Sequence, residues 1–288
     1  MTTTGARVPN DDRGGLTAGA VSALMSAHGF AVPPQNVRSA VSAHGVRVMG
    51  FPVRRSDARA VWQLWLDRRD DTGWYPVVTP REPAALASDP APRLGPGGRA
   101  TLAAALARDP EAVVGEVVAA AVRDTLAKAA DEEDAEEWLD ELIPERLAGA
   151  LRAEAALPEE GDLWEDLPLG TAPELWLCLV EAEQGHEIPA LLPGFPDAPN
   201  WWSEPTGRLL LPADHVAFLR SWHERFGADL FFLDGSRMRL VVRRPPLGPA
   251  AAARAAVERF AYCSDRLPDL PVLADGEVRS TAWKFWWD

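Results

Sequence analysis

The chain has 288 residues, of which 47% are hydrophobic and 25% are charged, and its formal net charge is −14 at pH 7. These values are typical of a globular protein with one large or two ordinary domains, and no apolar run reaches the roughly 18 residues that a membrane helix needs. The start, MTTTGARVPNDDRGG, has neither the basic cluster nor the apolar core of a secretion signal. We therefore expect a cytoplasmic protein without a membrane partner, whose Cys178 and Cys263 remain thiols.

The acidity is concentrated in the middle of the chain. Residues 1–99 carry 12 basic and 8 acidic side chains, residues 100–168 carry 5 and 19, and residues 169–288 carry 12 and 16. No clustered basic face with interleaved aromatic residues accompanies this pattern, so we expect no nucleic-acid partner. The run DEEDAEE at 131–137 predicts a solvated helix start, and an acidic surface that binds a partner is the alternative.

The N-terminal part predicts a disordered segment followed by helices and strands. Residues 1–14 are polar and lack periodicity, which is typical of disorder. Residues 15–80 form the first structured segment, with helices predicted over 16–29, 35–43 and 56–68 and strands over 46–53 and 74–78. The last three of these elements in chain order predict a β-α-β unit. Residues 81–99 are rich in proline and glycine and predict a linker.

The remaining two segments differ sharply in composition. Residues 100–168 are rich in Ala, Glu and Leu, which predicts an acidic helical insertion. Residues 169–288 predict a C-terminal α+β domain, whose elements are expected in the order strand, helix, strand, strand, helix, strand. This is the ferredoxin-like split β-α-β order of an antiparallel sheet with helices on one face, and the last strand is expected inside the sheet. The sequence leaves open whether the N-terminal β-α-β unit joins the same sheet.

The end of the chain, WKFWWD, is rich in aromatic residues, which indicates that it is folded. Read as a strand, it places Trp283, Phe285 and Trp287 on one face, which we expect to be buried. The other face carries Trp286 and Asp288, and these two residues are therefore candidates for a site.

The C-terminal domain contains the motifs SWHERFGADL, RRPP and FAYCSD and the terminal Trp-x-Phe-Trp-Trp-Asp pattern. Together these motifs resemble the bacterial domain of unknown function 4253. The resemblance covers roughly residues 44–80 and 174–288, so that the acidic middle looks like an insertion. In the family an aromatic-Cys-Pro-Asp element precedes the terminal motif, whereas this chain has Ser264 after Cys263. The resemblance implies no activity and no catalytic residue.

The sequence gives weak signals for chemistry. Cys263 is expected at a helix C-terminus beside Asp265, where both features raise the pKa of a thiol, so we expect a packed cysteine and not a nucleophile. His215 and His223 lie about two helical turns apart, but no metal-ligand motif is present, and we expect neither a metal nor a cofactor.

Two functions remain open from the sequence. The first is a non-catalytic protein-binding module that uses an aromatic face or the acidic helices, and its partner is another protein. The second is an enzyme that acts on a small substrate in a Trp-lined pocket. The oligomeric state is not predicted. The candidate site residues are Trp201, Trp202, Trp222, His223, Glu224, Asp229, Cys263, Asp265, Trp286 and Asp288.

Overall fold

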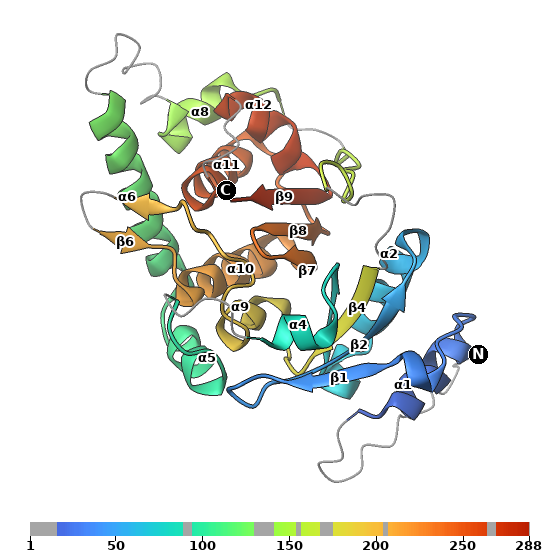
Figure 1. Ribbon diagram of the computed structural model, residues 1–288. Helices are drawn as coiled ribbons and strands as arrows, with labels where there is room; N and C mark the ends of the chain where they lie inside the picture. Colours follow the sequence, from blue (N-terminus) through green and yellow to red (C-terminus); the bar gives the residue numbers. More distant parts are fainter. Residues whose placement is uncertain are drawn as a thin grey trace.

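The computed structural model describes residues 16–88, 94–129, 141–153, 157–167, 175–203, 207–263 and 269–287. Their main feature is a seven-stranded sheet with helices around it, a mixed α and β architecture (Figure 1). The strand order is β1-β2-β4-β3-β7-β8-β9. Only β3 and β7 run parallel, and every other neighbouring pair is antiparallel.

The strands are short, as is usual in globular domains. Those of the large sheet are β1 (Arg38–Val41), β2 (Arg47–Val53), β3 (Tyr75–Thr79), β4 (Leu175–Val180), β7 (Ala228–Asp234), β8 (Arg237–Val242) and β9 (Ala282–Trp286). A second sheet consists of β5 (Trp202–Ser203) and β6 (Arg208–Leu209).

The helices vary from one turn to 20 residues. The α-helices are α1 (Ala18–Ala27), α2 (Arg55–Leu66), α3 (Arg69–Thr72), α4 (Pro83–Ala87), α5 (Arg99–Leu106), α6 (Pro110–Ala129), α8 (Pro144–Ala150), α9 (Ile188–Leu191), α10 (Pro212–Phe226), α11 (Pro249–Tyr262) and α12 (Leu270–Asp275). Short 3-10 helices are η1 (Pro34–Asn36), η3 (Gly185–Glu187) and η4 (Glu277–Arg279). Among the described helices, none combines the length and apolar character that a membrane crossing requires.

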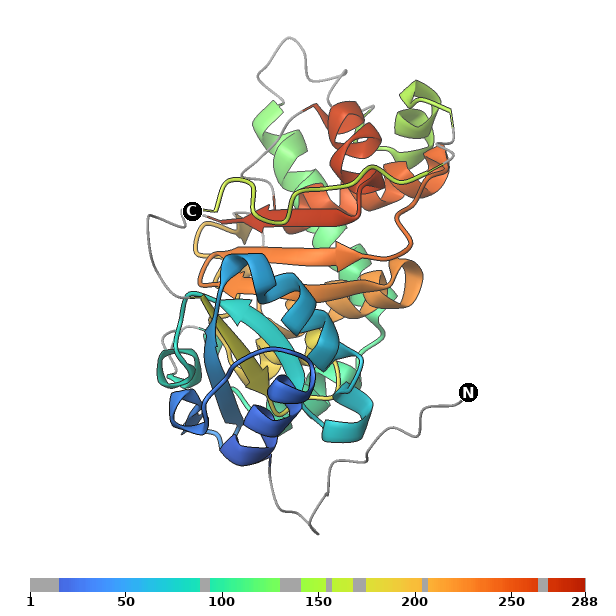
Figure 2. The same cartoon turned by 90° about the vertical axis from the view of Figure 1, so that its right-hand side faces the viewer.

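Helices cover both faces of the large sheet. Figure 2 shows α2 on one face, with α10 and α11 on the other. The buried side chain of Trp62 anchors α2, because its indole N–H lies 3.1 Å from the carbonyl oxygens of both Pro76 and Leu230. The expectation of helices on one face only is therefore wrong for this sheet.

The N-terminal β-α-β unit belongs to the same sheet as the C-terminal strands. Its strand β3 lies between β4 and β7, pairing antiparallel with β4 and parallel with β7. Its strand β2 pairs with the other edge of β4. The ferredoxin-like order is not confirmed, because two strands of the expected C-terminal set are separated by a strand from the N-terminal segment.

Two local predictions in the first hundred residues are wrong. The segment predicted as a helix over 35–43 forms η1 and then β1, which pairs with β2 across a turn at Gly45, where φ is +79°. The predicted linker over 81–99 contains α4, which packs against β1 and β2. The predicted disordered residues 1–14 and the acidic run 131–137 lie outside the described residues.

The helices of the acidic middle segment pack against the C-terminal domain. Helices α5 and α6 contact α10, while α6 and α8 contact α11. Ser221 in α10 donates a hydrogen bond of 2.7 Å to Glu111 at the start of α6, which joins the two segments by a polar contact. The acidic segment therefore forms part of the layer that covers one face of the sheet.

The terminal strand β9 lies at an edge of the sheet. The expectation that it lies inside the sheet is therefore wrong. The outward backbone groups of β9 are nevertheless bonded, since Lys284 N donates to Glu277 Oε1 at 2.7 Å and Lys284 O accepts from Arg259 Nη2 at 3.1 Å. Arg259 and Glu277 also form an ion pair with each other. Side chains thus occupy the positions that another strand would take, which protects this edge from unwanted pairing.

Candidate functional site

Trp222 is the centre of the aromatic cluster, and it is fully buried. Its ring stacks on Phe285 and meets Trp283 edge-on, with ring centroids 5.3 and 5.4 Å apart. Its indole N–H donates to the carboxylate of Glu258 at 2.9 Å. The predicted buried face of the terminal strand is confirmed, because Trp283, Phe285 and Trp287 are at most 1% exposed.

The other aromatic candidates do not combine into an exposed face. Trp201 is only 7% exposed, and its indole N–H donates to the carbonyl oxygen of Ala261 at 2.8 Å. Trp286 is half-buried beneath Arg237, whose guanidinium carbon lies 5.6 Å from the ring centroid. The side chain of Trp202 lies outside the described residues. Trp201 and Trp222 therefore belong to the core.

Cys263 follows the last residue of α11, where the sequence predicted it. Its thiol donates to the carbonyl oxygen of Trp286 at 2.9 Å, and the residue is buried. The thiol thus ties the end of α11 to the end of β9. The neighbouring candidate Asp265 lies outside the described residues, as does Asp288.

Two of the predicted polar candidates, His223 and Asp229, meet at the junction of α10 and β7. Nδ1 of His223 lies 3.1 Å from Oδ1 of Asp229, whose side chain is 2% exposed. The second oxygen of Asp229 lies 2.6 Å from Nη2 of Arg243. A buried carboxylate that holds one ring nitrogen fixes the orientation of an imidazole, and the side chain of His223 is 25% exposed.

Arg243 and two further residues, Tyr75 and His186, join this pair, and we name Tyr75, His186, His223, Asp229 and Arg243 together the histidine cluster. The rings of His186 and His223 have centroids 6.2 Å apart. Burial lowers the pKa of His186 to about 4, and His223 adds to this effect, so His186 is neutral at pH 7. Tyr75 donates its hydroxyl to the carbonyl oxygen of Leu230 at 3.2 Å, and burial raises the pKa of this hydroxyl well above its ordinary value.

The histidine cluster unites three parts of the chain because Gly185 lets η3 approach β3. A Cβ atom on Gly185 would lie 2.6 Å from Cζ of Tyr75, so only glycine fits there without a shift. Sequence reasoning missed Tyr75, His186 and Arg243, because no spacing links them to His223. The pairing of β3 with β7 brings Tyr75 to the cluster, the contact of η3 with α10 brings His186, and the β7–β8 hairpin brings Arg243.

The remaining histidine and acid candidates have structural partners. Glu224 is exposed and forms an ion pair with Arg220 one turn earlier, at 2.9 Å. His215 is buried, and Nδ1 lies 2.6 Å from the hydroxyl of Tyr262. Burial lowers the pKa of His215 to about 3, so this ring is neutral. Within the described parts of the chain, no three His, Cys, Asp or Glu side chains gather as a metal site would require.

The second site is the free edge of the sheet at β1. Ser42 N donates to Val46 O at 2.9 Å, and the alternation of an antiparallel ladder then directs the backbone groups of Ser39 and Val41 away from β2. Nothing in the described ranges bonds to these outward groups. The side chain of Val41 is 64% exposed. Among the described residues the two edges of the sheet therefore differ, because side chains occupy the edge at β9 and none bonds to the edge at β1.

The fold defines the chain as a mixed α and β protein with an open sheet edge and a buried polar cluster. Residues 176–288 match the family described as Domain of unknown function (DUF4253), and this part of the chain is therefore a domain of that family. The match begins inside β4 and ends with the terminal aromatic motif. Neither the curated proteins nor the solved structures contain a match to the chain.

Proposed function

We propose that this chain is a cytoplasmic, non-catalytic protein-binding module, and that its docking surface is the open edge at β1. The single observation that carries this proposal is the pair of outward-facing residues Ser39 and Val41, whose backbone groups have no partner among the described residues. Such an edge binds an extended segment by main-chain hydrogen bonds, while side chains beside it give specificity.

The partner that fits this edge is an extended segment of another protein with an acidic and an apolar side chain. Arg38 is exposed at the start of β1 and has no ion-pair partner within the described part of the chain, so a carboxylate opposite it would be stabilised. Val41 offers an exposed apolar side chain at the other end. The N-terminal 99 residues carry an excess of basic side chains, which also favours an acidic partner.

Ser39→Pro tests the backbone part of this proposal. Proline removes the outward N–H of residue 39 and leaves the bonds between β1 and β2 in place, because those use residues 38 and 40. A partner retained in a pulldown with the full chain, and then purified, should bind the variant at least about tenfold more weakly. Unchanged binding would show that the partner docks elsewhere.

Two valines of similar exposure provide the matched control. Val41 is 64% exposed in β1 and Val272 is 60% exposed in α12. Val41→Lys should weaken the same complex, because a lysine on the edge opposes strand addition, whereas Val272→Lys should not. Light scattering of the chain alone should give a monomer. If the chain is instead a dimer that Val41→Lys dissociates, the edge at β1 binds a second copy of this chain and not another protein.

A second function is favoured by the contact between His223 and Asp229. We infer that an enzyme using this histidine would employ it as a general base, with Asp229 holding Nδ1 so that Nε2 accepts the proton. Turnover of a panel of small ester and amide substrates should then be lost in His223→Gln and kept in His28→Gln, a change at an exposed histidine in α1's C-cap. Equal turnover in both variants would exclude His223 as the general base.

A further inference from the structure

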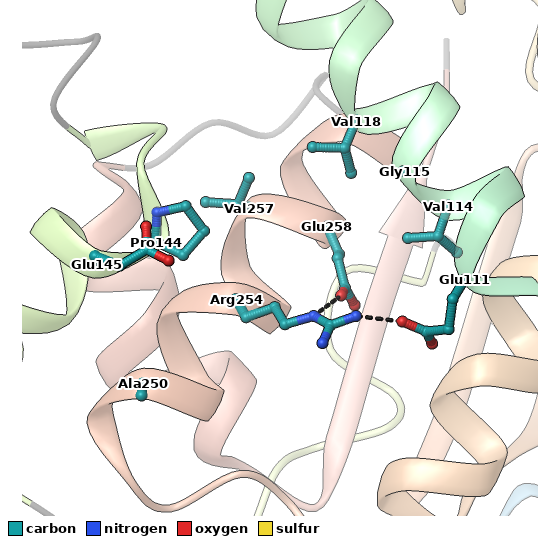
Figure 3. A pocket seen from close by; sticks show the side chains of 10 residues that line it. All are labelled: Glu111, Val114, Gly115, Val118, Pro144, Glu145, Ala250, Arg254, Val257 and Glu258. Atoms are coloured by element: carbon teal, nitrogen blue, oxygen red, sulfur yellow. Dashed lines mark hydrogen bonds and ion pairs between the residues drawn. The ribbon is translucent and has the colours of Figure 1, made fainter.

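A cavity of about 330 Å³ lies between α6, α8 and α11, away from the histidine cluster and from β1. It forms where the acidic middle segment meets the family domain, and Figure 3 shows its lining. This volume is in the range of sites for small organic molecules. The cavity is therefore large enough to be considered as a binding site.

One wall of the cavity is apolar. Val114 and Val118 on α6 approach Val257 on α11, and Pro144 at the start of α8 completes this wall (Figure 3). Val114 and Val257 are 3% and 2% exposed. This wall suits a short aliphatic body, which would gain about 25 cal/mol per Å² of apolar surface removed from water.

The opposite wall is charged, and its groups hold one another in place. Arg254 Nε donates to Glu258 at 2.9 Å, and its Nη2 bonds to Glu111. The side chain of Glu258 is 5% exposed and also forms an ion pair with Arg225 behind the wall. Burial raises the pKa of Glu111, but the hydrogen bond from Ser221 and the two arginines outweigh this effect and lower its pKa overall.

The cavity has an excess of negative charge. Three glutamates and one arginine line it, and Arg225 adds one positive charge from behind. Arg254 and Arg225 compensate two carboxylates, which leaves Glu145 at the start of α8. Glu145 is exposed, and no basic group among the described residues pairs with it. The groups around the cavity therefore have one negative charge in excess, which a bound cation would compensate.

Gly115 lies inside α6 and faces this cavity. A Cβ atom at this position would meet no atom within 4 Å, so packing does not require the glycine. Glycine in a helix interior costs about 0.5–1 kcal/mol relative to alanine. The position thus keeps space open beside the backbone of α6, at a cost to the helix.

We propose that the cavity binds a small organic cation, namely a primary ammonium group on a short aliphatic chain. The ammonium group lies near Glu145, which supplies the uncompensated carboxylate, and the aliphatic chain lies along Val118 and Val257. An anion of the same shape would be repelled by the uncompensated carboxylate of Glu145. This binding is independent of the docking of a protein at β1.

Hexylammonium and hexanoate test the charge part of the proposal, because they share an aliphatic body and carry opposite charges. Isothermal titration of the full chain with each compound should show saturable binding of hexylammonium, at least about tenfold tighter than hexanoate. Equal affinities, or no saturable binding of hexylammonium at millimolar concentrations, would overturn the proposal.

Two helical glycines test the location. A Cβ atom at Gly115 or at Gly149 meets no atom within 4 Å. Gly115→Leu should therefore place its side chain in the cavity and abolish binding of hexylammonium, whereas Gly149→Leu on α8 is the control because Gly149 does not line the cavity. Circular dichroism melts of both variants verify folding. Glu145→Gln should weaken hexylammonium about tenfold and leave hexanoate no weaker. Binding that survives Gly115→Leu, or a Glu145→Gln variant with unchanged affinity for hexylammonium, would overturn the assignment.

Discussion

Trp222 lies nearly parallel to Phe285, with the ring centroids 5.3 Å apart and an angle of 16° between the ring planes. This stack joins α10 to the terminal strand β9. Offset or edge-on aromatic contacts of this kind contribute about 0.5–1.5 kcal/mol each beyond the area they bury. The terminal motif therefore has a structural role in the core, whatever the protein binds.

The two adjacent tryptophans of the terminal motif should respond differently to truncation. Trp287 is 1% exposed and donates its indole N–H to Tyr262 O at 3.1 Å, so Trp287→Ala should lower the free energy of unfolding by about 3–5 kcal/mol. Trp286 is half-buried against Arg237, and Trp286→Ala should cost about 1 kcal/mol. Urea unfolding measures both changes, and equal losses would contradict the two-faced strand.

Glu277 should protect the edge at β9. Glu277→Ala leaves the N–H of Lys284 without its 2.7 Å bond, which should cost about 1–3 kcal/mol and expose the strand edge. Light scattering should then show association of the variant at concentrations where the parent chain is monodisperse. The control is Glu224→Ala, which removes a surface ion pair and should cost less than about 1 kcal/mol. Similar behaviour of the two variants would argue against edge protection.

His215 and His186 should make the protein less stable in mild acid. Burial lowers the pKa of His215 to about 3, and that of His186 to about 4, against about 6.5 in an unfolded chain. Below about pH 6.5 the unfolded state binds more protons, so stability is complete above that pH and falls as the pH decreases towards these folded-state values. The expected contribution is about 1 kcal/mol per pH unit for each histidine.

The variant His215→Gln isolates one of these two contributions. Its free energy of unfolding should fall less steeply between about pH 6.5 and pH 4 than that of the parent chain, by about one proton. Urea unfolding at a series of pH values gives both slopes. Identical slopes would mean that His215 also binds a proton in the folded state.

Gly50 and Gly149 should respond in opposite directions to the same substitution. A Cβ atom on Gly50 would lie 2.9 Å from Leu177 O, so Gly50→Ala should push β2 from β4 and cost about 1–3 kcal/mol. Gly149 in α8 meets open space, and Gly149→Ala should stabilise the protein by up to about 1 kcal/mol. Thermal melts measure the stability of both variants relative to the parent chain. A Gly50→Ala variant as stable as the parent chain would contradict the close approach of the two strands.

The family-matched segment should not fold by itself. A fragment of residues 176–288 lacks β3, which lies between β4 and β7 in the intact sheet. We expect the fragment to lose the dispersed amide spectrum of the full chain and to expose apolar surface, because both edges of β4 and one edge of β7 lose their partners. A fragment with a native-like spectrum would show that β4 and β7 can pair directly.

Local patterns predicted much of this fold because they depend on neighbours in sequence. The alternation at Trp283, Phe285 and Trp287 correctly gave their buried face, and the helix and two strands expected after the first C-terminal strand are present as α10, β7 and β8. The prediction of a helix over 35–43 was wrong. The spacing of Ala and Val in this segment suits a helix, but pairing with β2 stabilises a strand over 38–41. Tertiary contact outweighed local propensity there.

The site was less predictable, because it depends on distant contacts. His223 and Asp229 were found because both are polar residues near the end of α10. Tyr75 joined them through the placement of β3, and His186 joined them through the contact of η3 with α10. No spacing in the sequence specifies either contact. The cavity at Gly115 was likewise hidden, because its walls come from α6 and α8 of the acidic segment and from α11 of the C-terminal domain, which meet only in the folded chain.

The position of β3 also constrains how the protein is made. Val77 pairs with Cys178, about a hundred positions further along the chain, and the parallel neighbour Phe232 of Val78 comes later still. At a synthesis rate of about 5–20 residues per second, β2 and β3 wait several seconds on the ribosome before their shared partner β4 is made. During that interval the nascent chain carries β3 unpaired and one edge of β2 without its partner, so its yield in a cell should depend on chaperones that bind such segments.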